Sequence, residues 1–153
     1  MNKAVFIELP IPKKNRYVCD IAEKFYEEGK KVHIYASKKE DALQLSRDLW
    51  VWKQNSFVPH TVHFGQNGLD EDYEPVIITT VKLGGMADAI ILFDPLKPEE
   101  LSGYETVVDF AEVYDETRRN ESRKRFKAFR DDGHFEVHFA KIGAFLKDTA
   151  TGD

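Results

Sequence analysis

Short apolar runs alternate with segments of helical periodicity along this chain, and this alternation limits its fold more than any other feature. The runs have the length of buried strands, and Pro, Gly or polar residues bound them. Alternation of this kind with short connections predicts an α/β fold with a mostly parallel sheet. The expected strands are 4–7, 31–36, 76–80, 89–93, 104–110 and 134–139, and the expected helices are 13–28, 37–49, 116–130 and a short one from 140 to 146.

Length and composition indicate one soluble domain in the cytoplasm. The chain has 153 residues, of which 42% are hydrophobic and 32% charged, and this is ordinary for a globular protein. No apolar run approaches the roughly 18 residues that span a membrane, and the N-terminus lacks the apolar core of a signal peptide. Cys19 is the only cysteine, so we expect a buried small side chain and no internal disulfide.

The segment 116–130 concentrates positive charge on an otherwise acidic chain. It carries seven Lys or Arg residues with one acid among them, Glu121, whereas the whole chain has a net charge of −5. The segment contains no Gly or Pro, so we predict a helix. Asp115 or Thr117 can cap its start, and Gly133 follows its end.

A helical wheel at about 100° per residue places part of this charge in one stripe. Phe126 lies at the edge of the stripe, which consists of Arg119, Arg123, Lys127 and Arg130. Like charges at this spacing cost stability, which argues against a merely solvated surface. Cations beside an aromatic edge suit an acidic peptide with a hydrophobic end, or a nucleic-acid backbone. The pI of about 5.6 disfavours general nucleic-acid binding.

The motifs of nucleotide-binding and catalytic sites are missing from the sequence. The turn after the first strand contains no glycine, and neither G-x-G-x-x-G nor G-x-x-x-x-G-K-[ST] occurs. His134, Glu136 and His138 would share one strand face, but we interpret them as its exposed side, with Phe135, Val137 and Phe139 pointing inward. We therefore predict no catalytic residue, no metal site and no cofactor.

The segment 49–60, LWVWKQNSFVPH, places an unusual number of large apolar side chains where a loop should follow the second helix. One or two of them could fill the core, but four exceed that need, and exposed aromatic residues mark protein interfaces. The candidates are Trp50, Trp52, Phe57 and Val58.

Several blocks together resemble the chi subunit of bacterial DNA polymerase III. They are LW at 49–50 with SFVPH at 56–60, VVDF at 107–110, and RFKAFR at 125–130 with Gly133 after it, and segment 18–36 also matches in pattern. The likeness covers nearly the whole chain in the same order. It implies a single Rossmann-like domain over 1–153 with helices on both faces of the sheet, and a non-catalytic adaptor of the replisome.

The resemblance also implies two binding surfaces. The acidic C-terminal tail of the single-stranded DNA-binding protein, which ends in Phe with a free carboxylate, would bind Arg119, Arg123 and Lys127, to which the wheel adds Phe126 and Arg130. A separate surface would bind the psi subunit or an equivalent clamp-loader component, and also a repair helicase. This surface would include Trp50 and Phe57, with Trp52 and Val58 beside them. The chain would contact DNA only indirectly, and no membrane.

This sequence departs from the family pattern in three places, and other functions remain open. One extra residue lies between Phe110 and Tyr114, which shifts the first turn of the basic helix. Trp52 is an added aromatic residue, and the tail at about 140–153 is longer than expected. The alternatives are a nucleic-acid-binding protein that uses the basic helix directly on phosphates, and a nucleotide-binding enzyme on the same fold.

Overall fold

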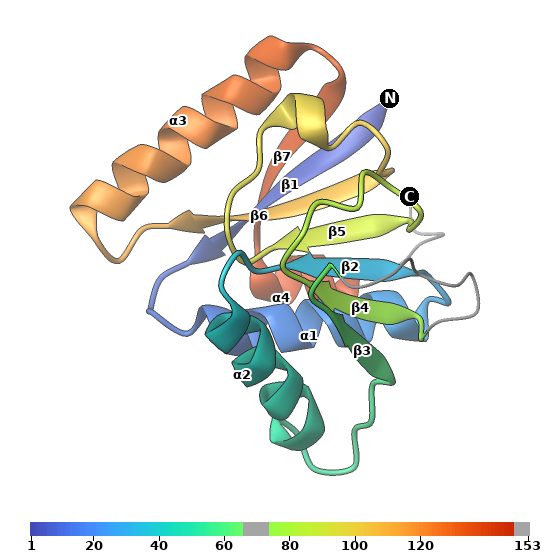
Figure 1. Cartoon of the computed structure of the whole chain (residues 1–153). Helices are drawn as coiled ribbons and strands as arrows, with labels where there is room; N and C mark the ends of the chain where they lie inside the picture. Colours follow the sequence, from blue (N-terminus) through green and yellow to red (C-terminus); the bar gives the residue numbers. More distant parts are fainter. Residues whose placement is uncertain (66–73, 149–153) are drawn as a thin grey trace.

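A seven-stranded sheet forms the centre of the computed structural model, which describes residues 1–65 and 74–148 (Figure 1). All its strand pairs are parallel, and the spatial order is β3-β4-β2-β5-β6-β1-β7. The strands are β1 (Asn2–Leu9), β2 (Val32–Tyr35), β3 (His60–His63), β4 (Val76–Thr79), β5 (Ala89–Leu92), β6 (Thr106–Glu112) and β7 (Phe135–Lys141). The predicted α/β class is confirmed.

Helices cover both faces of this sheet, and β1 shows the consequence in its sequence. Val5, Ile7 and Leu9 enter one core, whereas Ala4 and Phe6 enter the other. Because both faces are covered, the strand is a continuous apolar run and does not alternate with polar residues. The first core includes residues of α1 (Lys14–Glu27), α2 (Lys39–Val51) and α4 (Ile142–Lys147). The second includes residues of α3 (Glu116–Asp132) and residues on either side of the 3-10 turn η1 (Pro98–Glu100).

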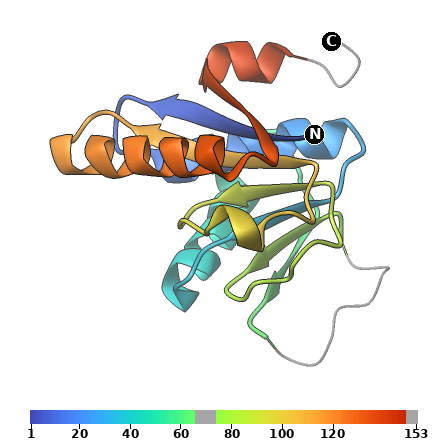
Figure 2. The ribbon, with the colours of Figure 1, turned by 90° about the horizontal axis from the view of Figure 1, so that it is seen from above.

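The described C-terminal part of the chain consists of β7 and α4. β7 lies at one edge of the sheet beside β1, and α4 follows it on the side away from η1 (Figure 2). The Phe145 ring of α4 lies 6.0 Å from the Phe25 ring of α1, edge to face. The short helix predicted over 140–146 is found at Ile142–Lys147, and residues 149–153 of the tail lie outside the described residues.

Two local expectations differ from the structure. β3 was not predicted, because His60–His63 is short and has polar side chains at an edge of the sheet. Phe139 was expected to point into the core but is 52% exposed, because it lies near the end of an edge strand that α3 does not cover fully. Glu136 and His138 lie exposed as expected and pair with each other at 2.7 Å. None of the described helices is long and apolar enough to cross a membrane.

Candidate protein-interaction sites

Helix α3 is unusually polar for a helix that covers a sheet. Over Glu116–Asp132 it buries only Ser122 and Phe129. Its ends follow the prediction: Asp115 Oδ2 accepts a hydrogen bond from the Arg118 backbone N–H at 3.0 Å, and Gly133 ends the helix with a φ of 81°. With so little apolar burial, the helix needs polar contacts to hold it on the sheet.

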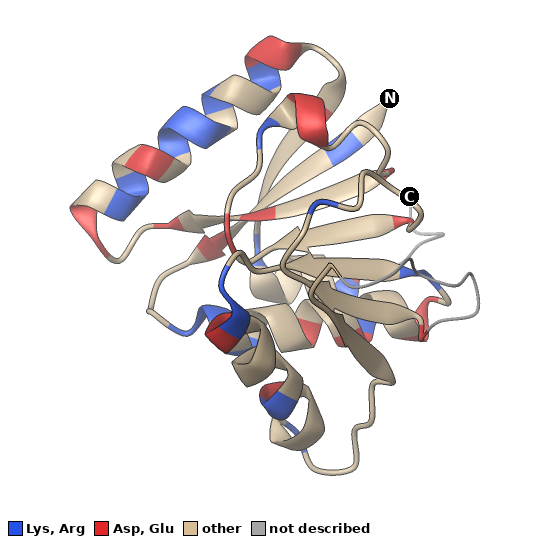
Figure 3. Cartoon of the chain, in the orientation of Figure 1, with Lys and Arg blue, Asp and Glu red and all other residues tan. Residues whose placement is uncertain are grey.

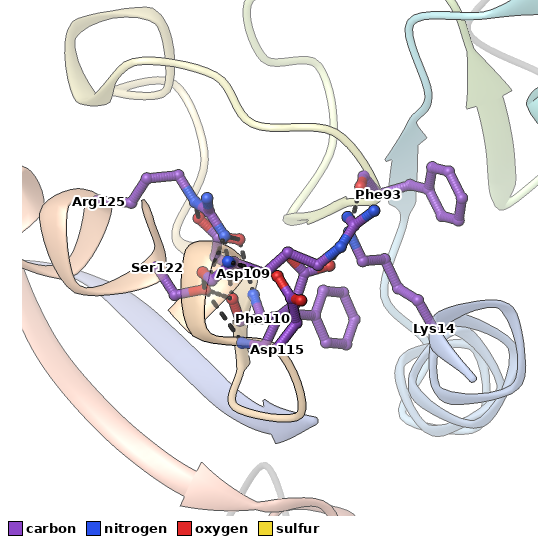
Figure 4. A network of polar contacts seen from close by, with 9 residues as sticks. Lys14, Phe93, Asp109, Phe110, Asp115, Ser122 and Arg125 are labelled. Atoms are coloured by element: carbon purple, nitrogen blue, oxygen red, sulfur yellow. Dashed lines mark hydrogen bonds and ion pairs between the residues drawn. The ribbon is translucent and has the colours of Figure 1, made fainter. Parts of the chain in front are cut away.

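Arg125 supplies the main polar contact between α3 and the sheet (Figure 4). Its Nε donates to Asp109 Oδ2 at 3.0 Å, and its terminal nitrogen donates to the Phe110 carbonyl oxygen, also at 3.0 Å. Beside it, Ser122 Oγ accepts a hydrogen bond from the Glu112 backbone N–H at 3.0 Å. One of the seven basic side chains of α3 therefore binds groups of the sheet and does not face a partner.

Asp109 is the buried partner of this contact. Burial raises the pKa of its carboxyl group, and the guanidinium of Arg125 opposes that rise. The pairing of Asp109 with Arg125 was not predicted from the sequence. The available signal was an aspartate within the apolar strand 104–110, because a buried carboxylate needs a cation or hydrogen-bond donors.

Lys14 and Glu112 fill the carboxyl edge of the sheet between α1 and β6. Their side chains form an ion pair at 2.7 Å, and Lys14 Nζ also donates to the Phe93 carbonyl oxygen at 2.9 Å. The same Nζ lies 5.2 Å from the centre of the Phe93 ring. Rossmann-type domains bind phosphates at this edge over a glycine-rich turn. Here protein side chains occupy the position, and the preceding turn has no glycine.

The other six Lys and Arg residues of α3 are spread along the helix among four acidic residues (Figure 3). Lys127 pairs with Asp131 at 2.7 Å, with both side chains more than half exposed, so water screens this pair and it contributes little. Arg119, Arg123 and Arg130 have no ion pair within residues 1–65 and 74–148. Three of the four residues in the predicted stripe are thus free to bind an anion.

A slot opens on one flank of α3, between the helix and the edge of the sheet. Its apolar walls are the rings of Phe6, Phe126 and Phe139, and Arg119 and Arg123 line the same space of about 330 Å³. The Phe6 and Phe126 rings pack edge to face at 5.2 Å. Phe139 is the exposed aromatic residue that the sequence analysis placed inward. The slot thus combines apolar rings with two arginine side chains.

Arg119 leaves an unsatisfied donor at this slot. Its Nε is buried and has no hydrogen-bond partner among the described residues, and an unpaired buried donor costs about 1–3 kcal/mol. An acceptor oxygen from a ligand would remove this cost. Of the predicted tail-binding residues, Arg119, Arg123 and Phe126 line the slot, whereas Lys127 and Arg130 lie exposed elsewhere on the helix.

Trp50 and Phe57 form an exposed aromatic pair at the end of α2. They are 58% and 57% exposed, and their ring centres lie 5.2 Å apart. Val51, which the sequence analysis did not select, is 78% exposed beside Trp50. Large apolar side chains grouped in this way are typical of interaction surfaces.

The other two candidates of this loop have different positions. Val58 is 0% exposed, which corrects its assignment to the surface: its side chain belongs to the buried cluster that also contains residues of α2. Trp52 is half-buried, packs against the same core, and lies 5.2 Å from the Arg16 guanidinium. The exposed pair is therefore Trp50 and Phe57.

Solved structures similar to this chain share its fold at low sequence identity. Saccharomyces cerevisiae Dbp5 bound to RNA and ADP BeF3 matches with a TM-score of 0.65 and 14% identity, over 95% of this chain and 42% of that one. The Dbp5 L327V C-terminal domain bound to Gle1 H337R and IP6 matches with a TM-score of 0.55 and 13% identity, over 96% and 98%. At this identity the likeness concerns the fold alone.

Sequence comparisons are more specific. DNA polymerase III subunit chi of Escherichia coli (strain K12) is 27% identical over 116 residues, which are 76% of this chain and 78% of that protein. The subunit of the same name from Haemophilus influenzae is 26% identical over 118 residues, 75% and 78% of the two chains. The family model described as DNA polymerase III chi subunit, HolC, matches residues 1–136. This chain therefore belongs to the DNA polymerase III chi subunit family.

Proposed function

We propose that this chain is a non-catalytic adaptor that binds the acidic C-terminal tail of the single-stranded DNA-binding protein at the slot beside α3. Membership of the chi family supports an accessory role in the replisome. The observation that carries the proposal is the Nε of Arg119, which has no partner among the described residues, at a slot that Phe6, Phe126 and Phe139 line. A ligand for it needs an acceptor oxygen and an apolar group.

The end of such a tail has both parts. Its terminal ring would enter between Phe126 and Phe139, and its terminal carboxylate would accept hydrogen bonds from Arg119 and Arg123. Guanidinium groups suit this role because their donors match the two oxygens of a carboxylate. The acidic residues before the terminus would lie over the rest of the basic helix, including Arg130. Salt would weaken this binding without abolishing it, because screening does not affect the buried ring.

The aromatic pair of Trp50 and Phe57 is the proposed contact for the clamp loader, through a psi subunit or an equivalent component, or for a repair helicase. Aromatic side chains of this kind are frequent anchors of interfaces. The pair lies on α2 and the loop after it, whereas the slot lies beside α3 on the other face of the sheet. Two partners can therefore bind at the same time.

The test is a titration of a fluorescent oligo-aspartate peptide that ends in phenylalanine, followed by anisotropy. We expect Arg123→Ala to weaken binding by at least ~1.5 kcal/mol, the scale of a lost charge-assisted hydrogen bond. Phe57→Ala is the matched control and should bind the peptide normally. The same peptide with an amidated terminus should bind more weakly than the free acid. If Phe57→Ala lost the peptide and Arg123→Ala kept it, the two surfaces would be assigned the wrong way round.

Direct binding of nucleic acid is the second candidate, because the three arginines of the stripe form no ion pair within the described residues. The net charge of −5 and the apolar rings of the slot favour the peptide. Filter binding of single-stranded DNA, first with this protein alone and then with its binding protein added, separates the two. Retention of bare DNA that Arg123→Ala abolished would support the nucleic-acid function instead.

A further inference from the structure

A second groove lies on the opposite flank of α3, between the helix and the segment that contains η1. On a wheel at about 100° per residue, Lys124 and Ala128 point roughly opposite to Arg119 and Arg123. The groove has a volume of about 560 Å³, within the range of about 300–1,000 Å³ that is usual for ligand sites. Its apolar lining consists of Tyr35, Pro95, Leu96, Pro98, Ala128 and Phe129.

The position of the groove in the sheet is one where α/β proteins bind ligands. Tyr35 is the last residue of β2, and Pro95 follows β5 closely. These neighbouring strands continue to opposite faces, β2 into α2 and β5 into η1. Ligands of open parallel sheets bind at the carboxyl ends of strands where the connections diverge in this way. The η1 segment and α3 lie next to each other on the same side of the sheet (Figure 1).

The charges of the groove favour an anionic partner. Lys97 lines the wall on the η1 side and Lys124 the wall on α3, and neither has an ion pair within the described ranges. Lys82 is paired with Glu100. Arg125 is engaged by the buried Asp109. Against the two free lysines stands one unpaired acid, Glu121.

We propose that this groove is a second docking site, which binds an acidic peptide with a bulky apolar side chain from a partner protein. The apolar side chain would lie on Leu96 and Phe129, and its acidic neighbours beside Lys97 and Lys124. A nucleotide fits less well, because Pro95 and Pro98 have no backbone N–H to donate to a phosphate. The site is separate from the slot at Phe126, so its existence does not depend on the function proposed for that slot.

Two-dimensional NMR with ¹⁵N-labelled protein tests the proposal. The probe is an oligo-aspartate peptide that ends in phenylalanine, added to the Arg123→Ala/Phe126→Ala variant so that the slot is disabled. We expect the amide signals of Leu96, Lys97 and Ala128 to shift in a saturable way. Lys124→Glu in the same background should weaken this binding at least tenfold.

Ala128→Trp is a second variant, because Ala128 is an exposed helix position where a large side chain fills the groove without disturbing the core. It should abolish the shifts while the circular dichroism spectrum stays unchanged. Absence of shifts at saturating peptide, or shifts caused by AMP and not by the peptide, would overturn the proposal. Peptide titration of the parent protein, in which the slot is intact, would still test the proposed tail binding separately.

Discussion

Replacing Arg125 with alanine removes the cation that neutralises Asp109 beneath α3. Arg123, two residues away on the same helix, has no partner within the described residues and points to the slot. Substitutions of these two arginines can therefore be compared directly. We expect Arg125→Ala to affect mainly stability, and Arg123→Ala to affect mainly peptide binding.

The burial of the Arg125–Asp109 ion pair determines how much stability Arg125→Ala should lose. The side chains of Arg125 and Asp109 are 19% and 4% exposed, and removing one partner of a buried pair costs about 3–5 kcal/mol. Because Arg125 keeps some contact with water, we expect a loss of ~3 kcal/mol, at the low end of this range. An exposed residue such as Arg123 should change stability by no more than ~0.5 kcal/mol.

The pH dependence identifies the cause of this loss. Burial already raises the pKa of Asp109 in the folded protein, and Arg125 counteracts the rise, so the variant should raise it further. A carboxyl group with a raised folded-state pKa contributes stability at low pH that is lost as the pH rises through that value. The Arg125→Ala variant should therefore be more strongly destabilised at neutral pH than in mild acid. Asp109→Asn in the same background should recover part of the loss at neutral pH.

Urea unfolding followed by circular dichroism measures these differences in the free energy of unfolding. They are read from the shift of the midpoint, provided that the dependence of the free energy on urea concentration is the same for all variants. A loss below ~1 kcal/mol for Arg125→Ala, the scale of a single ordinary hydrogen bond, would contradict a stabilising buried ion pair. Equal destabilisation by Arg123→Ala, or no recovery with Asp109→Asn, would contradict it as well.

Further predictions concern the aromatic loop, the core and catalysis. Phe57→Ala should keep its urea midpoint but lose ~2 kcal/mol in binding a clamp-loader component by calorimetry, whereas the buried Val58→Ala should lose ~2 kcal/mol of stability. Burial lowers the pKa of His33 to about 4, so folding stability should fall as the pH drops from ~6.5 toward that value. When the urea midpoint is measured at a series of pH values, His33→Gln should make its decrease with falling pH smaller. Purified protein should release no phosphate from ATP and no nucleotides from DNA; turnover that one point mutation abolished would contradict the adaptor function.

Much of the fold could be predicted because its signals are local. The continuous apolar runs at 76–80 and 89–93 predict strands covered on both faces, and β4 and β5 are such strands. β3 could not be predicted, because its four residues form a strand only through pairing with β4. Phe139 alternates correctly along β7, but its exposure depends on how far α3 extends over the edge of the sheet.

The ends of α3 and its charge follow from local sequence alone. Asp115 and Gly133 set its ends by contacts a few residues away, and the density of Lys and Arg requires no knowledge of the fold. Which of these cations form ion pairs depends on the packing of α3 against the sheet. Arg125 meets Asp109, sixteen residues earlier on another element, and Phe139 reaches Phe6 because β7 pairs with β1. The slot therefore arises from contacts between distant segments, which no local pattern contains.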